Sequence, residues 1–114
     1  MALHDLASMS TATTGTGTIT LGSATSGFLT FVGAGVVNGE TVSYGIVDGT
    51  NSEVGHGIYN ASGPSLTRLV IASSNSGSPI SLSGSATVYL TVLAEDIATL
   101  ATKSSSAGMA IIFG

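Results

Sequence analysis

Polar and apolar residues alternate along most of this chain with a period of two, which is the period of side chains on a β-strand. The clearest example is Thr41 to Val47, in which Val42, Tyr44 and Ile46 share one face. Several stretches alternate in this way or are short and β-prone, namely residues 16–21, 28–32, 41–47, 53–59, 65–72, 79–82 and 86–93. The pattern predicts an all-β chain.

Turn sequences separate these stretches, the clearest being Asp48-Gly49, Asn60 to Pro64 and Ser73 to Gly77. Because Leu69 to Ile71 is apolar on both faces, the stretch from Ser65 to Ala72 is expected to be the most central strand. The number and length of the strands favour a compact antiparallel β-sandwich or a partly open β-barrel of about six or seven short strands.

The first fourteen residues are expected to form an extended N-terminal arm. Leu3, Leu6 and Met9 are spaced three apart, which allows a turn or two of helix. The hydroxyl-rich residues 10–14 that follow favour extended chain instead.

The other end of the chain also departs from the β pattern. Ile97, Leu100 and Ala101 fall at helical spacing behind an acidic pair, which predicts a short helix between Ala94 and Lys103. The expected division is an arm at 1–14, a β domain at 15–95, and a short helix and apolar tail at 96–114.

The tail, Gly108 to Gly114, is almost wholly apolar. An apolar segment of this kind seldom remains in water. It is expected either to add a strand to its own sheet or to insert into a neighbouring subunit.

The composition is polar by hydroxyl groups and poor in charge. Serine, threonine and glycine supply 49 of the 114 residues, whereas eight are Asp, Glu, Lys or Arg. Soluble domains usually carry about a quarter charged residues, so the surface is expected to match repeated neighbours in an assembly. Arg68 and Lys103 are the only permanent cations, so nucleic acid binding is not expected.

Cysteine is absent, which excludes disulfide bonds and cysteine-based metal sites. No apolar run approaches the roughly twenty residues needed to span a bilayer. Residues 1–10 lack a basic region followed by an apolar stretch. Neither membrane association nor secretion is expected.

Three residues invite metal or acid–base chemistry. His56 is in phase with Val54 and Ile58, which favours a structural or interface role over metal binding. Asp48 and Glu53 could in principle serve glycoside hydrolysis or bind calcium. However, the Asp-Gly pair at position 48 is typical of a turn, and the alternating ligands of an EF-hand are missing. No metal or cofactor is expected.

Arg68 is the one cation within the predicted strands. It is expected to pair with Glu53, Asp48 or Glu40, or to anchor an interface. Although serine is abundant, the chain has no Gly-x-Ser-x-Gly motif and no combination of nucleophile, base and oxyanion donor. An enzyme is therefore not expected.

Four blocks of sequence occur in order: Gly-Thr-Gly-Thr-Ile-Thr-Leu-Gly at 15–22, Asp-Gly-Thr-Asn-Ser-Glu-Val-Gly at 48–55, Leu-Thr-Arg at 66–68 and Ser-Ser-Asn-Ser-Gly at 73–77. Over about Thr14 to Glu95, they resemble a small β module that recurs in the virion proteins of tailed bacteriophages. The resemblance implies a structural role in a virion that is assembled in the host bacterial cytoplasm. The chain departs from the module at His56, where an apolar residue is more frequent, and at Ser52, where an aromatic residue is usual.

Within that class, the chain length and the two distinctive ends favour a capsid decoration (cement) protein, typically a trimer that ties capsomers together. Its expected partners are further copies of itself and the major capsid protein or other virion proteins. The expected interface residues are Leu3, Leu6, Met9, His56, Arg68, Met109, Ile111, Ile112 and Phe113. The alternatives are a tail, baseplate or fibre-adaptor component, and, by analogy of architecture, a β module that binds host glycans.

Overall fold

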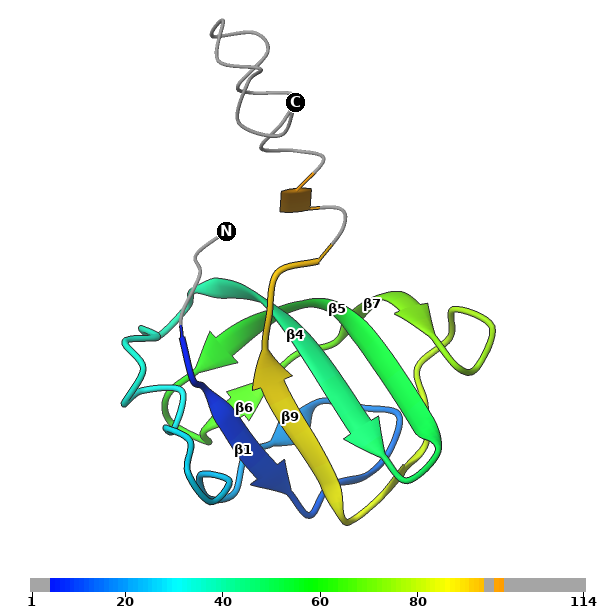
Figure 1. The fold of residues 1–114 in the computed structure, drawn as a ribbon, viewed down its shortest axis with the longest axis horizontal. Coiled ribbons are helices and arrows are strands. Elements are labelled where there is room, and N and C mark those ends of the chain that lie inside the picture. The colour runs from blue at the N-terminus through cyan, green and yellow to red at the C-terminus, as the bar shows by residue number, and fades with distance from the viewer. Residues whose placement is uncertain (1–4, 94–95, 98–114) are drawn as a thin grey trace, which may run out of the picture.

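The computed structural model describes residues 5–93 and 96–97, and the elements of its fold are all β-strands (Figure 1). The all-β prediction is confirmed. The strands are β1 (Ser8–Thr11), β2 (Thr14–Gly15), β3 (Ile19–Thr20), β4 (Thr41–Asp48), β5 (Asn51–Asn60), β6 (Ser65–Leu66), β7 (Leu69–Ser73), β8 (Leu82–Ser83) and β9 (Ala86–Leu90).

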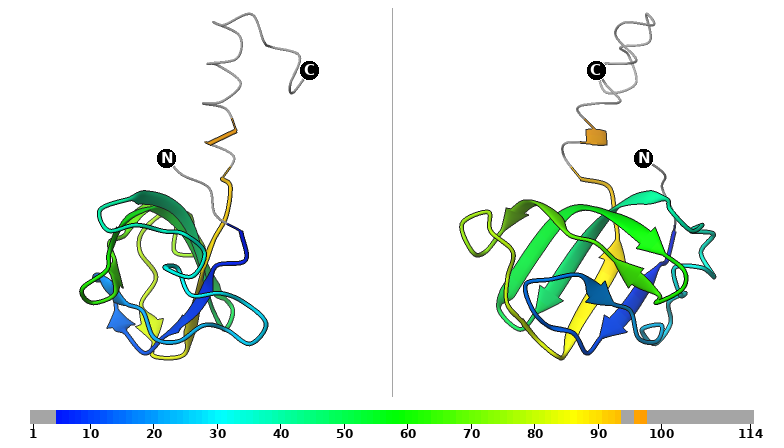
Figure 2. Two further views of the ribbon diagram at one scale, coloured as in Figure 1. Left: turned by 90° about the vertical axis from the view of Figure 1, so that its left-hand side faces the viewer. Right: turned by 180° about the vertical axis from the view of Figure 1, so that it is seen from behind.

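Most of the strands form one curled, half-barrel sheet (Figure 2). Its path runs β1-β9-β4-β5-β6-β3, and each pairing along this path is antiparallel. β7 pairs with the part of β5 that β6 leaves free, and β2 pairs with β8 in a small separate sheet. The predicted antiparallel, partly open barrel is therefore the observed architecture.

Residues 22–25, which follow β3, join the two end strands of the curled sheet. The N–H of Ser10 donates to the carbonyl of Ser23 at 2.8 Å, and the N–H of Thr25 donates to the carbonyl of Ser8 at 2.8 Å. These bonds tie β1 to the chain that leaves β3, so the seam of the half-barrel is bridged by backbone hydrogen bonds.

The predicted N-terminal arm is wrong where it overlaps β1. Ala7, Met9 and Thr11 are all buried, and Met9 lies opposite Val88 in the antiparallel pairing with β9. The inward residues are two apart, as in a strand, so the spacing of three was misleading. The sheet therefore begins before position 15. Residues 1–4 lie outside the described structure.

The β4–β5 hairpin turns at the predicted Asp48-Gly49 pair. Asp48 pairs with Asn51, which leaves Gly49 and Thr50 as a two-residue loop, and Gly49 has a φ of 64°. Only glycine adopts that backbone angle readily, and two-residue loops of this kind join twisted antiparallel strands.

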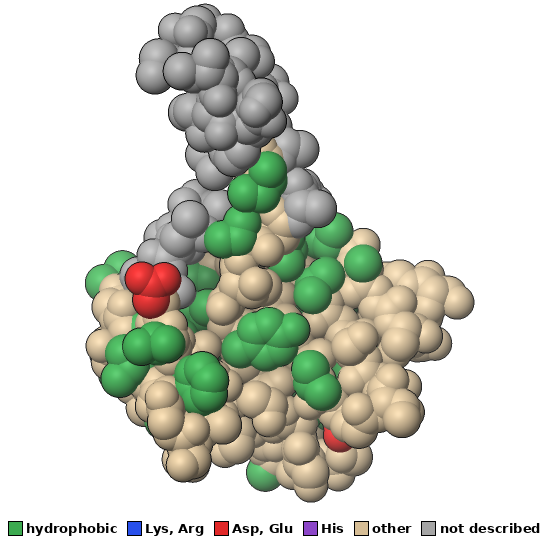
Figure 3. Space-filling model, viewed as in Figure 1, with side chains coloured by type: hydrophobic (Ala, Val, Ile, Leu, Met, Phe, Trp, Pro, Cys, Tyr) green, Lys and Arg blue, Asp and Glu red, His purple; other side chains and the backbone are tan. Residues whose placement is uncertain are grey.

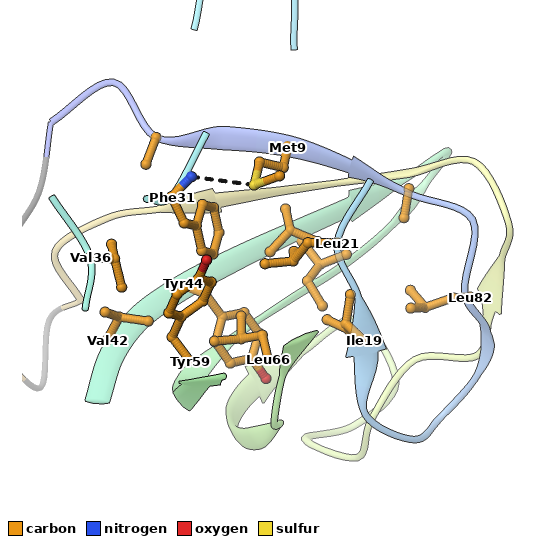
Figure 4. Close-up of a cluster of buried hydrophobic side chains, with 14 of the residues drawn as sticks. Met9, Ile19, Leu21, Phe31, Val36, Val42, Tyr44, Tyr59, Leu66 and Leu82 are labelled. Carbon is orange, nitrogen blue, oxygen red and sulfur yellow. Dashed lines mark hydrogen bonds between the residues drawn. The ribbon is translucent and has the colours of Figure 1, made fainter. Parts of the chain in front are cut away.

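The core lies inside the curled sheet, as Figure 4 shows. Val42, Tyr44 and Ile46 share the inward face of β4, as predicted, and each is fully buried. From β5, Tyr59 points into the same cluster, and Leu66 of β6 closes it from the next strand. One apolar cluster therefore holds the strands together.

The prediction of a strand at residues 28–32 is wrong: Leu29 makes one isolated bridge with Ala7, and residues 31–32 begin a turn. Phe31 is fully buried and its ring centroid lies 6.1 Å from that of Tyr59. The N–H of Phe31 lies 3.3 Å from the sulfur of Met9, whereas Phe28 is 46% exposed. The segment places one aromatic ring in the core and leaves the other in solvent.

The stretch from Ser65 to Ala72 is not the central strand that its apolar character predicted. It divides into β6 and β7, because Arg68 between them turns its side chain inward to Glu53. Leu69 is 66% exposed and Ile71 is 41% exposed. A run that is apolar on both faces is thus one of the more exposed parts of the described sheet.

The remaining predicted strands are present but shorter than expected. The stretch 16–21 contains β3, the stretch 79–82 overlaps the first residue of β8, and the stretch 86–93 contains β9. Element ends are the least reliable part of a sequence-based prediction.

Two glycines on facing strands allow close approach of their neighbours. A Cβ on Gly55 would overlap the backbone carbonyl of Leu69 across the β5–β7 pairing. A Cβ on Gly45 would overlap the ring of Tyr89, its partner on β9. Backbone cannot move aside without breaking the pairing, whereas a side chain can rotate.

We expect Gly55→Ala to destabilise the fold more than Gly45→Ala, because overpacking against a side chain costs about 1–3 kcal/mol and a clash with backbone costs more. The measurement is the free energy of unfolding in urea. Gly17→Ala is the control, since a Cβ there meets nothing within 4 Å. If Gly55→Ala and Gly45→Ala lowered the free energy of unfolding equally, the distinction between a backbone clash and a side-chain clash would be wrong.

Candidate functional site

A buried ion pair joins β5 to the chain between β6 and β7. Nη2 of Arg68 lies 2.5 Å from Oε1 of Glu53, and Nε lies 2.9 Å from Oε2. The two side chains are 2% and 0% exposed. Of the three partners that the sequence allowed for Arg68, the structure selects Glu53. The guanidinium is buried within the chain and is not exposed as an interface anchor would be.

The polar atoms of this pair are fully satisfied. The guanidinium also donates to the carbonyls of Gly15 at 3.3 Å, Gly17 at 3.2 Å and Ile80 at 2.8 Å. The carboxylate also accepts the N–H of Ile80 at 3.0 Å and the hydroxyl of Tyr44 at 2.7 Å. An arginine has five N–H donors and a carboxylate about four acceptor sites, so the network has no unused hydrogen-bonding capacity.

These contacts shift the pKa values of the network in the directions that burial and charge dictate. Burial acts to raise the pKa of Glu53, but the hydrogen bonds from Arg68, Tyr44 and the N–H of Ile80 outweigh it and lower the pKa below its ordinary value of 4.5. Burial and the hydrogen bond to Glu53 raise the pKa of Tyr44. Glu53 is therefore held as an anion and Tyr44 as a neutral donor, which is the arrangement of a structural network rather than of an acid–base pair.

Asp48 is engaged in a separate structural contact. Its Oδ2 accepts the N–H of Ser83 at 2.7 Å, and its Oδ1 accepts the Ser83 hydroxyl at 2.7 Å. Asp48 and Glu53 thus have different partners and do not form a carboxylate pair. Within residues 5–93 and 96–97, no group of three or more His, Asp or Glu side chains is placed to hold a metal ion.

His56 is held by Asp96 on the outer face of the β4–β5 pair. Its Nε2 lies 3.1 Å from Oδ1 of Asp96, whose Oδ2 accepts the hydroxyl of Ser43 at 2.6 Å and the N–H of Leu93 at 2.9 Å. Burial acts to raise the pKa of Asp96, but the bonds from Ser43, Leu93 and His56 outweigh it and lower the pKa below its ordinary 3.8. His56 therefore has a structural role, one of the two that its position predicted.

The predicted helix from Ala94 to Lys103 lies mostly outside the described residues. Within it, Asp96 and Ile97 are described, and the N–H of Ile97 donates to the carbonyl of Leu93 at 3.2 Å. This is one hydrogen bond of helical spacing, and it follows the buried Asp96.

Most of the charged side chains in the described residues are buried. The described residues include six that are charged, and the side chains of Asp48, Glu53, Arg68 and Asp96 are buried. Figure 3 shows one face of the molecule on which apolar side chains are widespread and no basic side chain is visible. Charged side chains are normally the most exposed, so this surface is unusual for a soluble domain.

An apolar groove of about 430 Å³ opens on this low-charge surface beside β1 and β9. Leu6, which is 62% exposed, and Phe28 stand at its walls. No charged side chain lines it, and the hydroxyls of Ser8 and Thr25 are bonded to each other at 3.0 Å. The lining residues are Leu6, Ala7, Ser8, Thr25, Phe28, Thr87, Tyr89 and Leu90.

The predicted interface residues fall into three groups. Leu6 is exposed at the groove, and His56 is partly exposed beside Asp96. Met9 and the Arg68 side chain are buried and are not available to a partner. The others lie outside the described residues, namely Leu3, Met109, Ile111, Ile112 and Phe113.

Sequence reasoning missed Phe28 and Tyr89 as surface candidates, because both were assigned to strands by their apolar character. The signal for Phe28 was its position directly after the Ser26-Gly27 pair, which favours a turn. The signal for Tyr89 was absent, since its contact with Gly45 arises only from strand pairing.

Comparison with known proteins does not identify the chain: no family model matches it, and neither a curated protein nor a solved structure matches it. Within the described residues, no helix is long and apolar enough to cross a bilayer.

We expect Arg68→Met to cost about 3–5 kcal/mol in the free energy of unfolding, because it leaves the Glu53 carboxylate buried without its cation. The double variant Arg68→Met/Glu53→Gln should cost about 1–3 kcal/mol less than the sum of the two single variants. Chemical denaturation of the three variants measures this coupling. Strict additivity would show that the two side chains do not act as a pair.

Acid should destabilise the protein in a defined direction. Because the pKa values of Glu53 and Asp96 are lower in the folded than in the unfolded state, both carboxylates stabilise the fold above their unfolded pKa values. That stability is lost as the pH falls below about 4.5 toward the folded values. Thermal unfolding between pH 7 and pH 2 measures the loss. Asp96→Asn should make thermal stability fall less steeply as the pH drops from about 5 to 2. If the pH dependence of this variant were unchanged, Asp96 would not contribute to acid destabilisation.

Proposed function

We propose that this protein is a structural component of a tailed-bacteriophage virion, and that it acts as a capsid decoration protein through protein–protein contacts. The observation that carries the proposal is the low-charge, apolar outer surface of a fold whose charged groups are mostly internal. Such a surface resembles the buried part of an interface, where charged residues are depleted.

The sequence blocks that carry the resemblance to phage virion modules have structural roles in this fold. Asp48 bonds to Ser83, while Glu53 and Arg68 form the internal ion pair. The side chains of Asp48, Glu53 and Arg68 specify the scaffold and are buried, so they are not accessible for binding a partner. The binding function is therefore assigned to the outer surface, where the chain is free to differ from other modules of the same kind.

The backbone of Leu6 supports a contact at the groove. Leu6 has a φ of 63°, which is uncommon for a residue with a side chain, and its side chain is 62% exposed. A left-handed conformation costs roughly 1–2 kcal/mol. The backbone of Leu6 is held by the N–H of Leu29, which donates to the Leu6 carbonyl at 2.8 Å, but its exposed side chain adds little to the stability of the free chain. We therefore assign the side chain's contribution to an occupied groove.

The groove favours a protein segment over a glycan. Sugar sites need polar groups that fix the orientation of the ligand. In this groove the hydroxyls of Ser8 and Thr25 already bond to each other, and the remaining lining is largely apolar. An apolar segment of another subunit matches that chemistry better.

We expect Phe28→Asp to weaken assembly at least tenfold, because it places a charge on the groove wall. The measurement is the mass of the protein in solution by light scattering, together with its co-sedimentation with phage heads. Thr50→Asp is the matched control, since it adds the same charge in the exposed β4–β5 loop.

Cryo-electron microscopy of the source particle tests the location. A decoration protein should be present in hundreds of copies over the head, whereas a tail or baseplate component should be present in a few or a dozen. Equal binding of the two aspartate variants, or absence of the protein from purified particles, would overturn the proposal.

A further inference from the structure

β7 has an open edge. It pairs with β5 on one side, and no strand within the described residues pairs with its other side. Exposed edges are usually protected by charged residues or proline. Residues 69–73 contain neither, and a bulge in the pairing with β5 is the protective feature that they have. Leu69 and Ile71 are exposed along this strand.

A small apolar pocket lies beside this edge. Its volume is about 170 Å³, which is below the roughly 300–1,000 Å³ of small-molecule sites but sufficient for one large apolar side chain. Ile58, 50% exposed, and Leu69 form its apolar walls. The complete lining is Thr41, His56, Gly57, Ile58, Thr67 and Leu69.

The chain leaves the described structure next to this surface. Asp96 is bonded to His56, and His56 lies directly opposite Leu69 in the β5–β7 pairing. Because successive partners across a sheet share a face, the chain that continues beyond Ile97 begins within a strand spacing or two of β7.

The sequence beyond Ile97 contains a segment that suits this edge. Residues 109–113 read Met-Ala-Ile-Ile-Phe, which is apolar, β-prone and as long as the five residues of β7. Residues 98–108 form the connection. A flexible connection of that length spans about 18 Å on average, and about 25 Å remains within reach if its first six residues are helical.

This short connection favours the same chain over a second copy. A segment tethered within reach of its site has an effective concentration in the millimolar range. A segment from another molecule competes only at the concentration of the protein, which is far lower in dilute solution.

We propose that residues 109–113 of the same chain add a strand to the open edge of β7 and place one apolar side chain in the pocket beside Leu69. The added strand satisfies the free backbone groups of β7 and keeps this edge from pairing with other chains. The groove beside β1 and β9 remains open. The inference does not depend on the virion role, because it concerns the free chain.

Disulfide trapping tests the contact, and the absence of cysteine from the chain gives a clean background. Leu69→Cys is combined in turn with Ala110→Cys, Ile111→Cys or Ile112→Cys. The pair that cross-links fastest identifies the tail residue that lies nearest to Leu69. At low micromolar protein under mild oxidant, we expect at least one pair to form an intramolecular disulfide ten times faster than the control Val37→Cys/Ile111→Cys. Val37 is a suitable control because it is 63% exposed.

Hydrogen exchange provides a second readout that needs no cross-link. The variant Ile111→Asp/Ile112→Asp should exchange the amides of residues 69–72 at least tenfold faster than the unmodified chain, while the β4 amides stay unchanged. Three results would overturn the proposal: a control pair that cross-links as fast, disulfides that form only between mixed single-cysteine chains, or unchanged exchange at 69–72.

Discussion

The ion pair between Glu53 and Arg68 constrains the rest of the structure. It lies inside the barrel, and its hydrogen bonds reach β4 through Tyr44 and the chain around Gly15 and Ile80. A buried ion pair is weak support for stability, because removing two charges from water offsets most of their attraction. The ion pair contributes mainly by fixing the positions of the segments that it contacts. A guanidinium has fixed directions, so segments far apart in sequence meet it in one arrangement, whereas an apolar cluster tolerates several. The strands β2, β3, β6 and β8 have two residues each, and short strands gain most from such a fixed point.

Placing the charges inside has a consequence for the surface. A chain with eight charged residues has few to distribute, and this fold places four of those it describes in buried contacts. The exterior then relies on serine and threonine hydroxyls for contact with water, interrupted by large apolar side chains. This arrangement is unfavourable for an isolated domain at high concentration, because low surface charge promotes association. It suits a protein whose working state is an assembly, because desolvating a hydroxyl costs less than desolvating an ion, and burying a methyl group is favourable.

The sequence predicted the parts of the fold that local pattern specifies. The β4–β5 hairpin combines an alternating strand with an Asp-Gly turn, so its two strands and the turn between them were predicted. β1 was missed because the spacing of Leu3, Leu6 and Met9 suggested a turn of helix, although Ala7 and Met9 alternate with Ser8 and Ser10. The position of β7 was missed because periodicity shows that a stretch is apolar but not which neighbours cover it. For the ion pair, the sequence narrowed the partners of Arg68 to three carboxylates, and only strand pairing could bring one of them within 3 Å. The apolar groove was beyond prediction, since its walls come from three separate parts of the chain.

The shortage of surface charge also changes how this protein has to protect its sheet edges. Natural sheets commonly use an exposed lysine or an inward-pointing charge to prevent edge pairing. This chain has no lysine in the described residues, and its arginine is committed to Glu53. The seam between β1 and β3 is instead covered by backbone, through residues 22–25. Coverage by a segment of the same chain is also consistent with an edge at β7 that carries neither charge nor proline. A sequence with few charges, of which most described ones are committed to internal contacts, therefore leaves backbone hydrogen bonds to protect the seam between β1 and β3.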